Sequence, residues 1–352
     1  MKKIFSLAAS IIKLFILIYF FSNSNVFANN NKYYSNDKGI LSIMYHRFNE
    51  NKYPSTNINM EVFKKQFELI KEQKISFINP EDFKLNFNTP KERKKILITI
   101  DDGFTSFYEN AWPYLKERKI PFILFISTEA IGKYGYMDWS QIKEIEKEKF
   151  AFIGNHSHSH EYLVGYNFNE FKKDIDTSID IFKNNIGYNP VFFSYPFGEY
   201  SLEQKEYISS KFDFAFGQHS GIIDINKDKY ELPRFPINEK YGEIKRFKSL
   251  LKTIPFPYKK ISPSERYLDE KNNPPDVNIQ FFEDGPDIKN ITCFSNENNK
   301  WRKSKLHFHK KNELKIILDE KFTTERGRIN CSLREEGGYW RWLGVQFVIA
   351  SK

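Results

Sequence analysis

The stretch ILITIDDGF, residues 96–104, joins an apolar run to two adjacent carboxylates and a glycine. The run from residue 95 to residue 100 predicts a strand, and Gly103 permits a sharp turn directly after it. Two adjacent carboxylates at a strand end, here Asp101 and Asp102, project to different sides and can serve different chemical roles. An Asp-Asp-Gly sequence after a strand is also typical of a solvated turn, so this stretch alone leaves both interpretations open.

A second stretch, GNHSHSHEYL at 154–163, holds three of the seven histidines and follows another apolar run. One carboxylate together with His156 and His160 suits a divalent metal ion and leaves positions open for water and substrate. A lone His-x-x-x-His is equally a surface or capping feature. The two stretches lie about 55 residues apart, each at a predicted strand end, and together they favour the metal site.

The region around these stretches alternates short apolar runs with helical periodicity. The predicted strands are residues 40–46, 95–100, 121–127, 150–156, 190–196 and 212–218. The predicted helices are residues 60–73, 107–119, 140–149 and 169–187, the last ending at Gly187 as a C-cap. This alternation indicates a largely parallel α/β sheet or barrel, in which active sites collect at the carboxyl ends of the strands.

The composition changes after about Lys252. A Pro-rich polar stretch predicts a linker over 253–276, and the short alternating runs that follow predict a small β-sandwich over 277–352. Cys293 and Cys331, the two cysteines of the chain, lie in this last part, and we expect a disulfide there rather than a catalytic thiol. The preceding domain is expected to occupy residues 29–252.

Residues 1–28 have the pattern of a signal peptide, with Lys2 and Lys3, a short apolar core, and a V-x-A cleavage site after Ala28. The chain is therefore expected to be exported and to be periplasmic, cell-surface or secreted; an uncleaved anchor is the alternative. An apolar content of 40% with 17% aromatics excludes a disordered chain.

The net charge is +9, and it falls to +6 without the three lysines of the signal. That charge suits peripheral association with an envelope or another anionic surface, although an ordinary basic surface would look the same. The dense basic stripe typical of nucleic-acid binding is missing from the sequence, so no nucleic-acid partner is expected.

The two polar stretches resemble the motifs of a known family. ITIDDGF resembles the T-F-D-D-G motif of the polysaccharide deacetylase family (NodB-homology, carbohydrate esterase 4), and GNHSHSHEYL is similar to its G-N-H-[ST]-x-S-H-x-x-L motif. The resemblance covers roughly residues 38–250. It implies a distorted (β/α) barrel and a hydrolase that removes acetyl groups from an N-acetylated extracellular or envelope glycan.

The resemblance also implies roles for individual residues. Asp102, His156 and His160 would hold a divalent metal, zinc in the first place and cobalt, nickel or iron as alternatives, and Asp101 would act as general base. His158 falls at the variable position of the motif and is not expected to be a ligand.

Two departures from the family pattern carry their own predictions. FSYPFGEY at 193–200 matches the R-x-P-[YF]-G loop, but Ser194 stands where the family has Arg. The backbone N–H of Phe197 can still stabilise an oxyanion, and Arg234 is a candidate for the missing brace of the catalytic Asp. The general acid would be His46, an arrangement that resembles exported poly-N-acetylglucosamine deacetylases with permuted strand order; a buried structural histidine is the alternative.

Further substrate contacts are expected from Trp139, Tyr195 and Pro196, although Trp139 could equally pack in the core. His307 and His309 share a strand face but make only a weak metal site. A glycan O-acetyl esterase and a non-catalytic glycan-binding protein on the same scaffold remain alternatives to the deacetylase, and a 2-His-1-carboxylate oxygenase is a more distant one.

Overall fold

The computed structural model describes residues 37–350. The predicted signal peptide lies outside this range. Within 37–350, no helix combines the length and the apolar composition that a membrane crossing requires.

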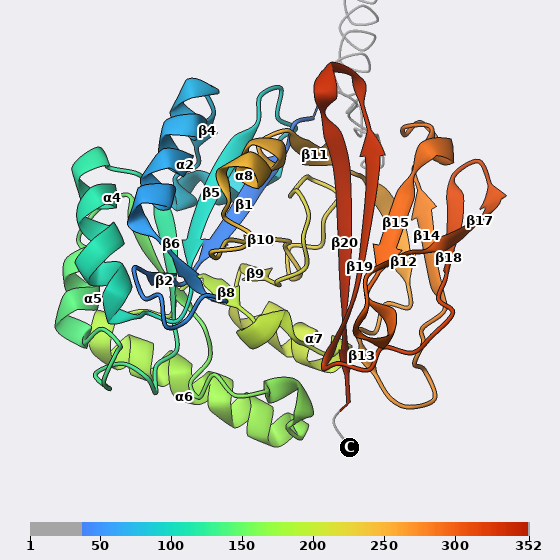
Figure 1. Ribbon diagram of the computed structural model, residues 1–352. Helices are drawn as coiled ribbons and strands as arrows, with labels where there is room; N and C mark the ends of the chain where they lie inside the picture. Colours follow the sequence, from blue (N-terminus) through green and yellow to red (C-terminus); the bar gives the residue numbers. More distant parts are fainter. Residues whose placement is uncertain (1–36, 351–352) are drawn as a thin grey trace, which may run out of the picture. The chain divides into compact units, whose positions relative to one another are not determined.

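A parallel sheet forms the centre of the first part of the molecule (Figure 1). Its strand order is β10-β1-β5-β6-β7-β8-β9, and β4 pairs in addition with β5. The strands are β1 (Ile40–Tyr45), β4 (Ser76–Phe77), β5 (Lys95–Ile100), β6 (Phe122–Ile126), β7 (Ala151–Asn155), β8 (Phe192–Ser194), β9 (Phe214–Phe216) and β10 (Phe235–Pro236). A separate short pair joins β2 (Arg47–Phe48) to β3 (Asn57–Ile58). The sheet with its helices forms an incomplete (β/α) barrel, as expected.

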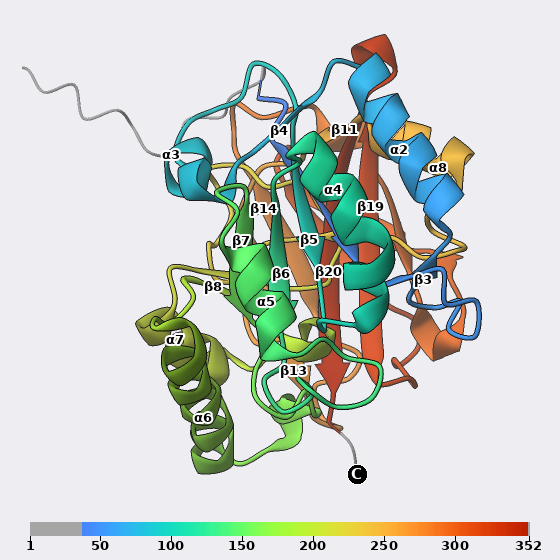
Figure 2. The same cartoon turned by 90° about the vertical axis from the view of Figure 1, so that its left-hand side faces the viewer.

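The helices are α2 (Met60–Glu72), α3 (Phe83–Phe87), α4 (Trp112–Arg118), α5 (Trp139–Glu146), α6 (Phe168–Ile186), α7 (Leu202–Lys211) and α8 (Ile244–Leu250). The four predicted helices are present as α2, α4, α5 and α6, and the structure adds α3, α7 and α8. Figure 2 shows α4 and α5 in front of β5 and β6, covering one face of the sheet, with α2 beside α4. Helix α6 ends at Gly187, whose φ of 86° is left-handed, so the predicted C-cap is confirmed.

The alternation along β5 sends side chains to two different cores. Ile96 and Ile98 pack outward in the core cluster that includes Phe63 of α2, whereas Leu97 packs inside the barrel with Phe125. Because strand residues alternate between faces, Thr99 and Asp101 are on the inner face with Leu97. The polar side chains at the end of β5, those of Thr99 and Asp101, therefore face the barrel interior.

Residues 232–235 bridge β9 and β1 and so close the barrel between them. Leu232 exchanges backbone hydrogen bonds with Ala215 and Gly217 beside β9, and Phe235 pairs with Ile43 of β1. Arg234 lies between these two attachment points and is completely buried. The backbone pairing of its neighbours therefore holds Arg234 at the seam of the barrel.

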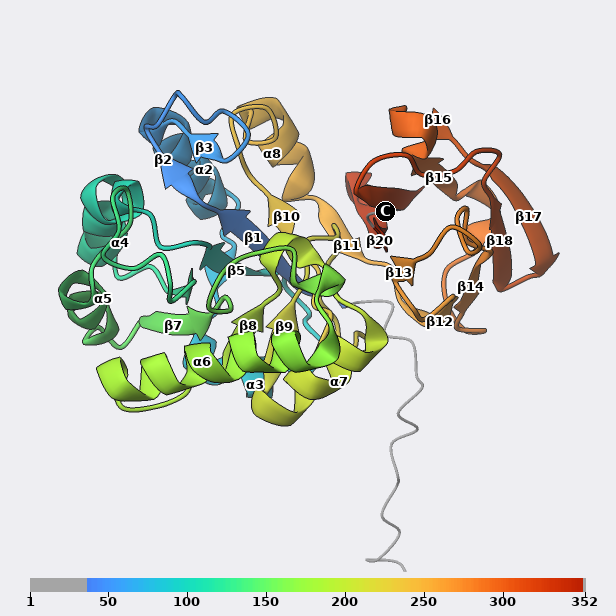
Figure 3. The ribbon, with the colours of Figure 1, turned by 90° about the horizontal axis from the view of Figure 1, so that it is seen from below.

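The C-terminal part consists of two sheets around one core (Figure 3). One has the order β11-β20-β19-β15-β16 with β13 beside β20, and the other has the order β12-β14-β18-β17. The strands are β11 (Thr253–Pro255), β12 (Tyr258–Ser262), β13 (Tyr267–Leu268), β14 (Val277–Phe281), β15 (Thr292–Ser295), β16 (Arg302–Lys303), β17 (Lys305–Lys310), β18 (Glu313–Ile317), β19 (Arg326–Arg334) and β20 (Trp340–Ile349). Cys293 and Cys331 lie opposite each other on β15 and β19 and form the expected disulfide.

The stretch 253–276 differs from the expected linker. It supplies β11 and β13, which pair with β20, and β12, which pairs with β14. Its prolines suggested a linker because proline cannot donate a backbone hydrogen bond. Since β11 and β12 lie at sheet edges, prolines at or near their ends leave the ladders intact.

Candidate metal centre and catalytic site

Three side chains from the ends of β5 and β7 converge at the carboxyl edge of the parallel sheet. Oδ1 of Asp102 lies 3.2 Å from Nε2 of His160 and 3.4 Å from Nε2 of His156. One ligand atom from each of the three residues lies within 4.8 Å of the others. Asp102 has a φ of 76° and His160 a φ of 55°, so both ligands sit in backbone conformations that non-glycine residues rarely adopt.

The hydrogen bonding of this cluster fits a metal ion. Nδ1 of His156 donates to the carbonyl oxygen of Ser194 at 2.6 Å, which leaves Nε2 without a proton in the neutral ring. Among residues 37–350, neither this buried Nε2 nor the buried Oδ1 of Asp102 has a hydrogen-bond partner. Buried polar atoms are normally paired, and an imidazole nitrogen beside a carboxylate oxygen is a donor set for a divalent cation.

Electrostatics keep Asp102 in the protonation state that a metal ligand requires. Burial alone would raise the pKa of Asp102, but the imidazoles of His156 and His160 outweigh it and hold that pKa well below its usual range. The Asp102 carboxylate is therefore ionised at neutral pH and available as a ligand.

Asp101 is held by Arg234 in a fully buried pair. Nη1 of Arg234 donates to Oδ1 of Asp101 at 2.7 Å, and Nη2 donates to Oδ2 at 2.8 Å. Burial raises the pKa of Asp101, but the charges of Arg234 and His156 counteract it, and the net pKa is lowered. Asp101 is thus an ionised carboxylate inside the barrel, 3.7 Å from Nε2 of His156.

Ser194 takes part in the same network. Nη2 of Arg234 donates to Oγ of Ser194 at 2.7 Å, and the Ser194 hydroxyl donates to Oδ2 of Asp101 at 3.4 Å. The remaining donors of Arg234 reach the carbonyl oxygen of Gly217 at 3.0 Å and Oγ1 of Thr99 at 3.2 Å. A small hydroxyl at position 194 leaves room for a guanidinium that arrives from the other side of the barrel.

His46 follows directly on β1 at the same edge of the sheet and is partly buried. Burial lowers its pKa, while the nearby charges of Asp102 and Asp101 act in the opposite direction. Its place beside both carboxylates is compatible with proton transfer at this site.

The loop after β8 contributes Phe197, whose φ of 58° and ψ of 5° are left-handed. Its ring contacts the ring of His160 edge-on at 4.8 Å between centroids and stacks on Tyr162 at 4.4 Å. Tyr195 and Pro196 of the same loop are buried, and the Tyr195 hydroxyl donates to the carbonyl oxygen of Tyr230. Their side chains belong to the core, so they shape the loop rather than offer a surface to substrate.

Two other sequence candidates lie apart from the cluster. His158 turns to Thr128, with 2.9 Å between Nδ1 and Oγ1, and is absent from the group of three possible ligands. Trp139, at the start of α5, packs edge-on against Phe182 of α6 and against the core behind the sheet. Its surroundings are those of a packing residue.

Sequence reasoning missed four residues in or around the loop of residues 195–200, here called the Phe197 loop. They are Tyr162, Glu199, Arg326 and Gln346. Tyr162 and Glu199 lay within the quoted motifs, where only their neighbours drew attention. Arg326 and Gln346 come from β19 and β20 and carried no motif; their approach to the loop depends on how two distant segments pack.

Part of the chain is similar to known polysaccharide deacetylases. Residues 88–214 match the family model for polysaccharide deacetylase. The chain is 30% identical over 110 residues to YxkH of Bacillus subtilis (strain 168), an alignment that covers 31% of this chain and 39% of that protein. It is 23% identical over 198 residues to the poly-beta-1,6-N-acetyl-D-glucosamine N-deacetylase of Staphylococcus aureus (strain MRSA252), covering 52% of this chain and 68% of that one.

Solved structures share the fold of the first part of the chain. IcaB from Ammonifex degensii superposes with a TM-score of 0.56 at 22% identity, covering 61% of this chain and 97% of that one. The Streptococcus pyogenes deacetylase PplD superposes with a TM-score of 0.55 at 19% identity, covering 61% and 99%.

Proposed function

We propose that this chain, of which residues 88–214 match the polysaccharide deacetylase family model, is a metal-dependent hydrolase that removes N-acetyl groups from an N-acetylglucosamine-containing glycan. The observation that carries the proposal is the convergence of Asp102, His156 and His160 with unpaired ligand atoms beside the Asp101–Arg234 pair. We propose that the substrate is an extracellular or cell-envelope polysaccharide, which agrees with the export signal expected at residues 1–28.

The metal would be held by Asp102, His156 and His160, and zinc is the first candidate because the set is one carboxylate and two imidazoles. Such an ion supplies Lewis-acid polarisation of the acetyl carbonyl and lowers the pKa of water. The choice of zinc rests on this donor set alone and belongs to the proposal.

Asp101 is the proposed general base. Its carboxylate is ionised and oriented by two hydrogen bonds from Arg234, so one oxygen can accept a proton as water attacks the acetyl carbon. The backbone N–H of Phe197 is the proposed donor to the oxygen that becomes negatively charged. His46 is the proposed acid that protonates the departing amine, a step that amide cleavage needs because an amide anion is a very poor leaving group.

The Asp101–Arg234 pair also bears on the non-catalytic alternative. Ser194 taken alone favours an inactive scaffold, because the family's usual Arg is absent from this loop. Arg234 supplies a guanidinium to the same carboxylate from the segment that precedes β10, so the feature no longer argues for loss of activity.

The test is acetate release by the purified chain from N-acetylglucosamine oligomers, peptidoglycan and acetylated xylan, each with chelator and with added zinc. We expect chelator-sensitive acetate from an amino-sugar polymer and none from the Asp101→Asn variant. Acetate from xylan alone would identify an esterase, and a metal-loaded chain that releases no acetate from any of the three would contradict the proposal.

A further inference from the structure

The backbone at Phe197 needs support from its surroundings. A left-handed conformation costs a non-glycine residue about 1–2 kcal/mol, so it persists only where neighbouring groups hold it. The next residue, Gly198, also has a positive φ of 70°, and a Cβ there would approach the backbone nitrogen of Gln218 to 2.4 Å. The loop is therefore both strained and tightly enclosed.

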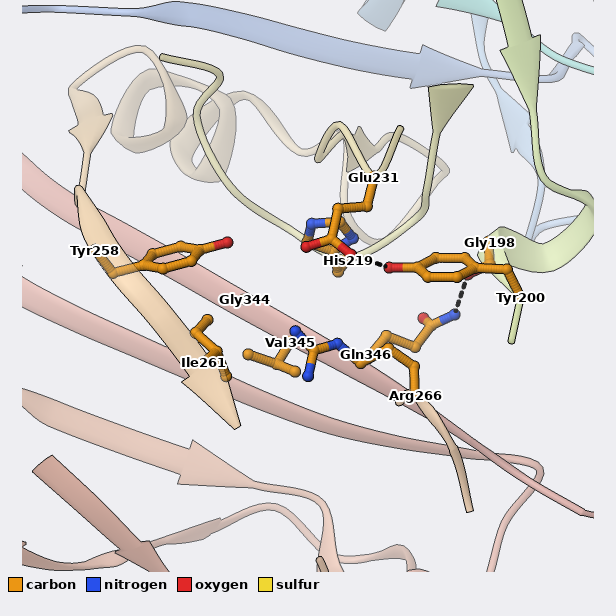
Figure 4. A pocket seen from close by; sticks show the side chains of 10 residues that line it. All are labelled: Gly198, Tyr200, His219, Glu231, Tyr258, Ile261, Arg266, Gly344, Val345 and Gln346. Carbon is orange, nitrogen blue, oxygen red and sulfur yellow. Dashed lines mark hydrogen bonds between the residues drawn. The ribbon is translucent and has the colours of Figure 1, made fainter. Parts of the chain in front are cut away.

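Gln346 of β20 holds this loop through its carbonyl groups. Its Nε2 donates to the carbonyl oxygen of Phe197 at 3.1 Å and to that of Gly198 at 3.3 Å. Its Oε1 accepts from Nε of Arg328, the residue opposite it on β19, at 3.1 Å. Figure 4 shows the Gln346 amide pointing at Gly198. Arg328 orients the amide, and both amide protons reach the two residues that have left-handed backbones.

Arg326 of β19 holds the other side of the same loop. Its Nε donates to Oε1 of Glu199 at 2.6 Å, and the Glu199 side chain is only 3% exposed. The guanidinium also lies over the ring of Phe197, at 5.1 Å from the centroid. Tyr162 stacks on that ring at an angle of 12°. A charged hydrogen bond, a cation–π contact and a ring stack thus converge on Phe197 and Glu199, the two loop residues that flank Gly198.

These contacts come from one face of the β19–β20 hairpin. Residues of β19 alternate between the core of the C-terminal sheets and the opposite face, and Arg326, Arg328 and Asn330 share that opposite face. Asn330 accepts a hydrogen bond from Ser220, and Trp342 donates to the same hydroxyl at 2.7 Å. A face whose polar pattern looks solvent-directed is instead placed against the first part of the chain.

We propose that Gln346 and Arg326 are positioning residues for the hydrolase site: the C-terminal sheets hold the Phe197 backbone in its active conformation. The C-terminal sheets then contribute to catalysis, because they hold a backbone group of the active site in place. The inference rests on the proposed function for its kinetic consequence, because Phe197 is the proposed oxyanion donor. The physical claim, that Gln346 restrains residues 195–200, holds independently of the substrate.

Two substitutions test it in the full chain. Gln346→Met keeps length and neutrality but removes the donor, and Gln346→Glu places a carboxylate against two carbonyl oxygens. Gln280→Glu, at an exposed position of β14, is the matched control. We expect amide hydrogen exchange in residues 195–200 to become at least about 5-fold faster in both Gln346 variants and to stay unchanged in the control.

The kinetic readout separates positioning from general destabilisation. We expect kcat for acetate release to fall about 10- to 100-fold in both Gln346 variants, with KM and zinc affinity close to those of the parent chain and, in Gln346→Met, a thermal midpoint close to the parental one. Arg326→Lys, which keeps the charge but loses the planar contact with Phe197, should show the same pattern with a smaller loss. A kcat equal to that of the parent, or one that falls only in step with the thermal midpoint, overturns the inference.

The failure of the inference and that of the proposed function remain distinguishable. If the parent chain releases acetate and the Gln346 variants match it, only the positioning role is wrong. If the parent chain releases none, the proposed function is wrong, and the exchange measurement still decides whether Gln346 restrains the loop: unchanged exchange overturns the restraint, and faster exchange supports it.

Discussion

The guanidinium of Arg234 donates two hydrogen bonds, of 2.7 and 2.8 Å, to the carboxylate of Asp101, a residue 133 positions earlier in the chain. Both side chains are completely buried, and Ser194 bonds to both. A buried pair of this kind is costly to break, because the partner that remains is a charge without compensation.

Arg234→Lys keeps the positive charge but cannot form the bidentate hydrogen bonds with Asp101. We expect acetate release to fall by about 10- to 100-fold and the free energy of unfolding to fall by about 1–3 kcal/mol. Arg302→Lys is the matched control, since Arg302 pairs with Glu320 at 2.6 Å on the surface and should change stability by less than about 1 kcal/mol. An Arg234→Lys chain with parental activity would show that the brace is dispensable.

Zinc should stabilise the folded chain through the three proposed ligands. At a free zinc concentration 100 times the Kd, linkage predicts a gain of about 2.7 kcal/mol in the free energy of unfolding, visible as a higher thermal midpoint. Asp102→Asn and His156→Gln should abolish this gain. His158→Gln should retain it, because His158 bonds to Thr128 instead. Equal loss in the His158 variant would mean that the ligand set has been wrongly chosen.

Acidification should destabilise the fold through His219, which lines a small pocket with Glu231 and Arg266 (Figure 4). Burial lowers the pKa of His219 to about 4; Glu231 acts against this shift, and Lys227, Arg266 and Lys205 add to it. The unfolded chain, with an ordinary histidine pKa of about 6.5, binds the proton more readily between these two values. The free energy of unfolding therefore falls as the pH drops from about 6.5 to about 4, by up to about 3 kcal/mol.

Urea unfolding at a series of pH values measures this effect. His219→Gln should flatten the dependence in that window, whereas His307→Gln, at an exposed strand position, should leave it unchanged. Identical slopes for the parent chain and the His219 variant would assign the acid sensitivity to other groups.

The Cys293–Cys331 disulfide should contribute to stability mainly by restricting the unfolded chain. It closes a loop with a sequence separation of 38, for which the loop-entropy relation gives about 4 kcal/mol. The double variant Cys293→Ser/Cys331→Ser should lower the urea midpoint accordingly, and reduction of the parent chain should reproduce the shift. Reduction that leaves the midpoint unchanged would show that the disulfide adds no measurable stability through restriction of the unfolded chain.

Much of the fold could be predicted because local patterns agree with the tertiary arrangement. The apolar run before Asp101 forms β5 over the predicted residues, and Gly187 ends α6 as expected. The stretch 253–276 was misjudged because its prolines and polar residues look alike in a linker and in edge strands. Only the pairing of β11 with β20 and of β12 with β14 distinguishes the two.

The residues of the candidate site were also only partly predictable from the sequence. Asp101, Asp102, His156 and His160 could be selected from the sequence because they lie within five residues of the ends of β5 and β7. Parallel strands bring their carboxyl ends to one edge. The sequence alone could not place Tyr195 in the core or turn Trp139 towards Phe182, since an aromatic residue near a motif serves packing and substrate equally well.

The sequence by itself thus determined the strand–helix alternation, the carboxylate and imidazole groups at the strand ends, and the cysteines that pair. The sequence offered Arg234 only as a candidate brace, and the tertiary structure decided that it reaches Asp101. The approach of Gln346 and Arg326 to the Phe197 loop came from the tertiary structure alone. The physical reason is distance along the chain. Strand ends are set by local periodicity, whereas these contacts depend on barrel closure and on which face of β19 and β20 packs against the barrel.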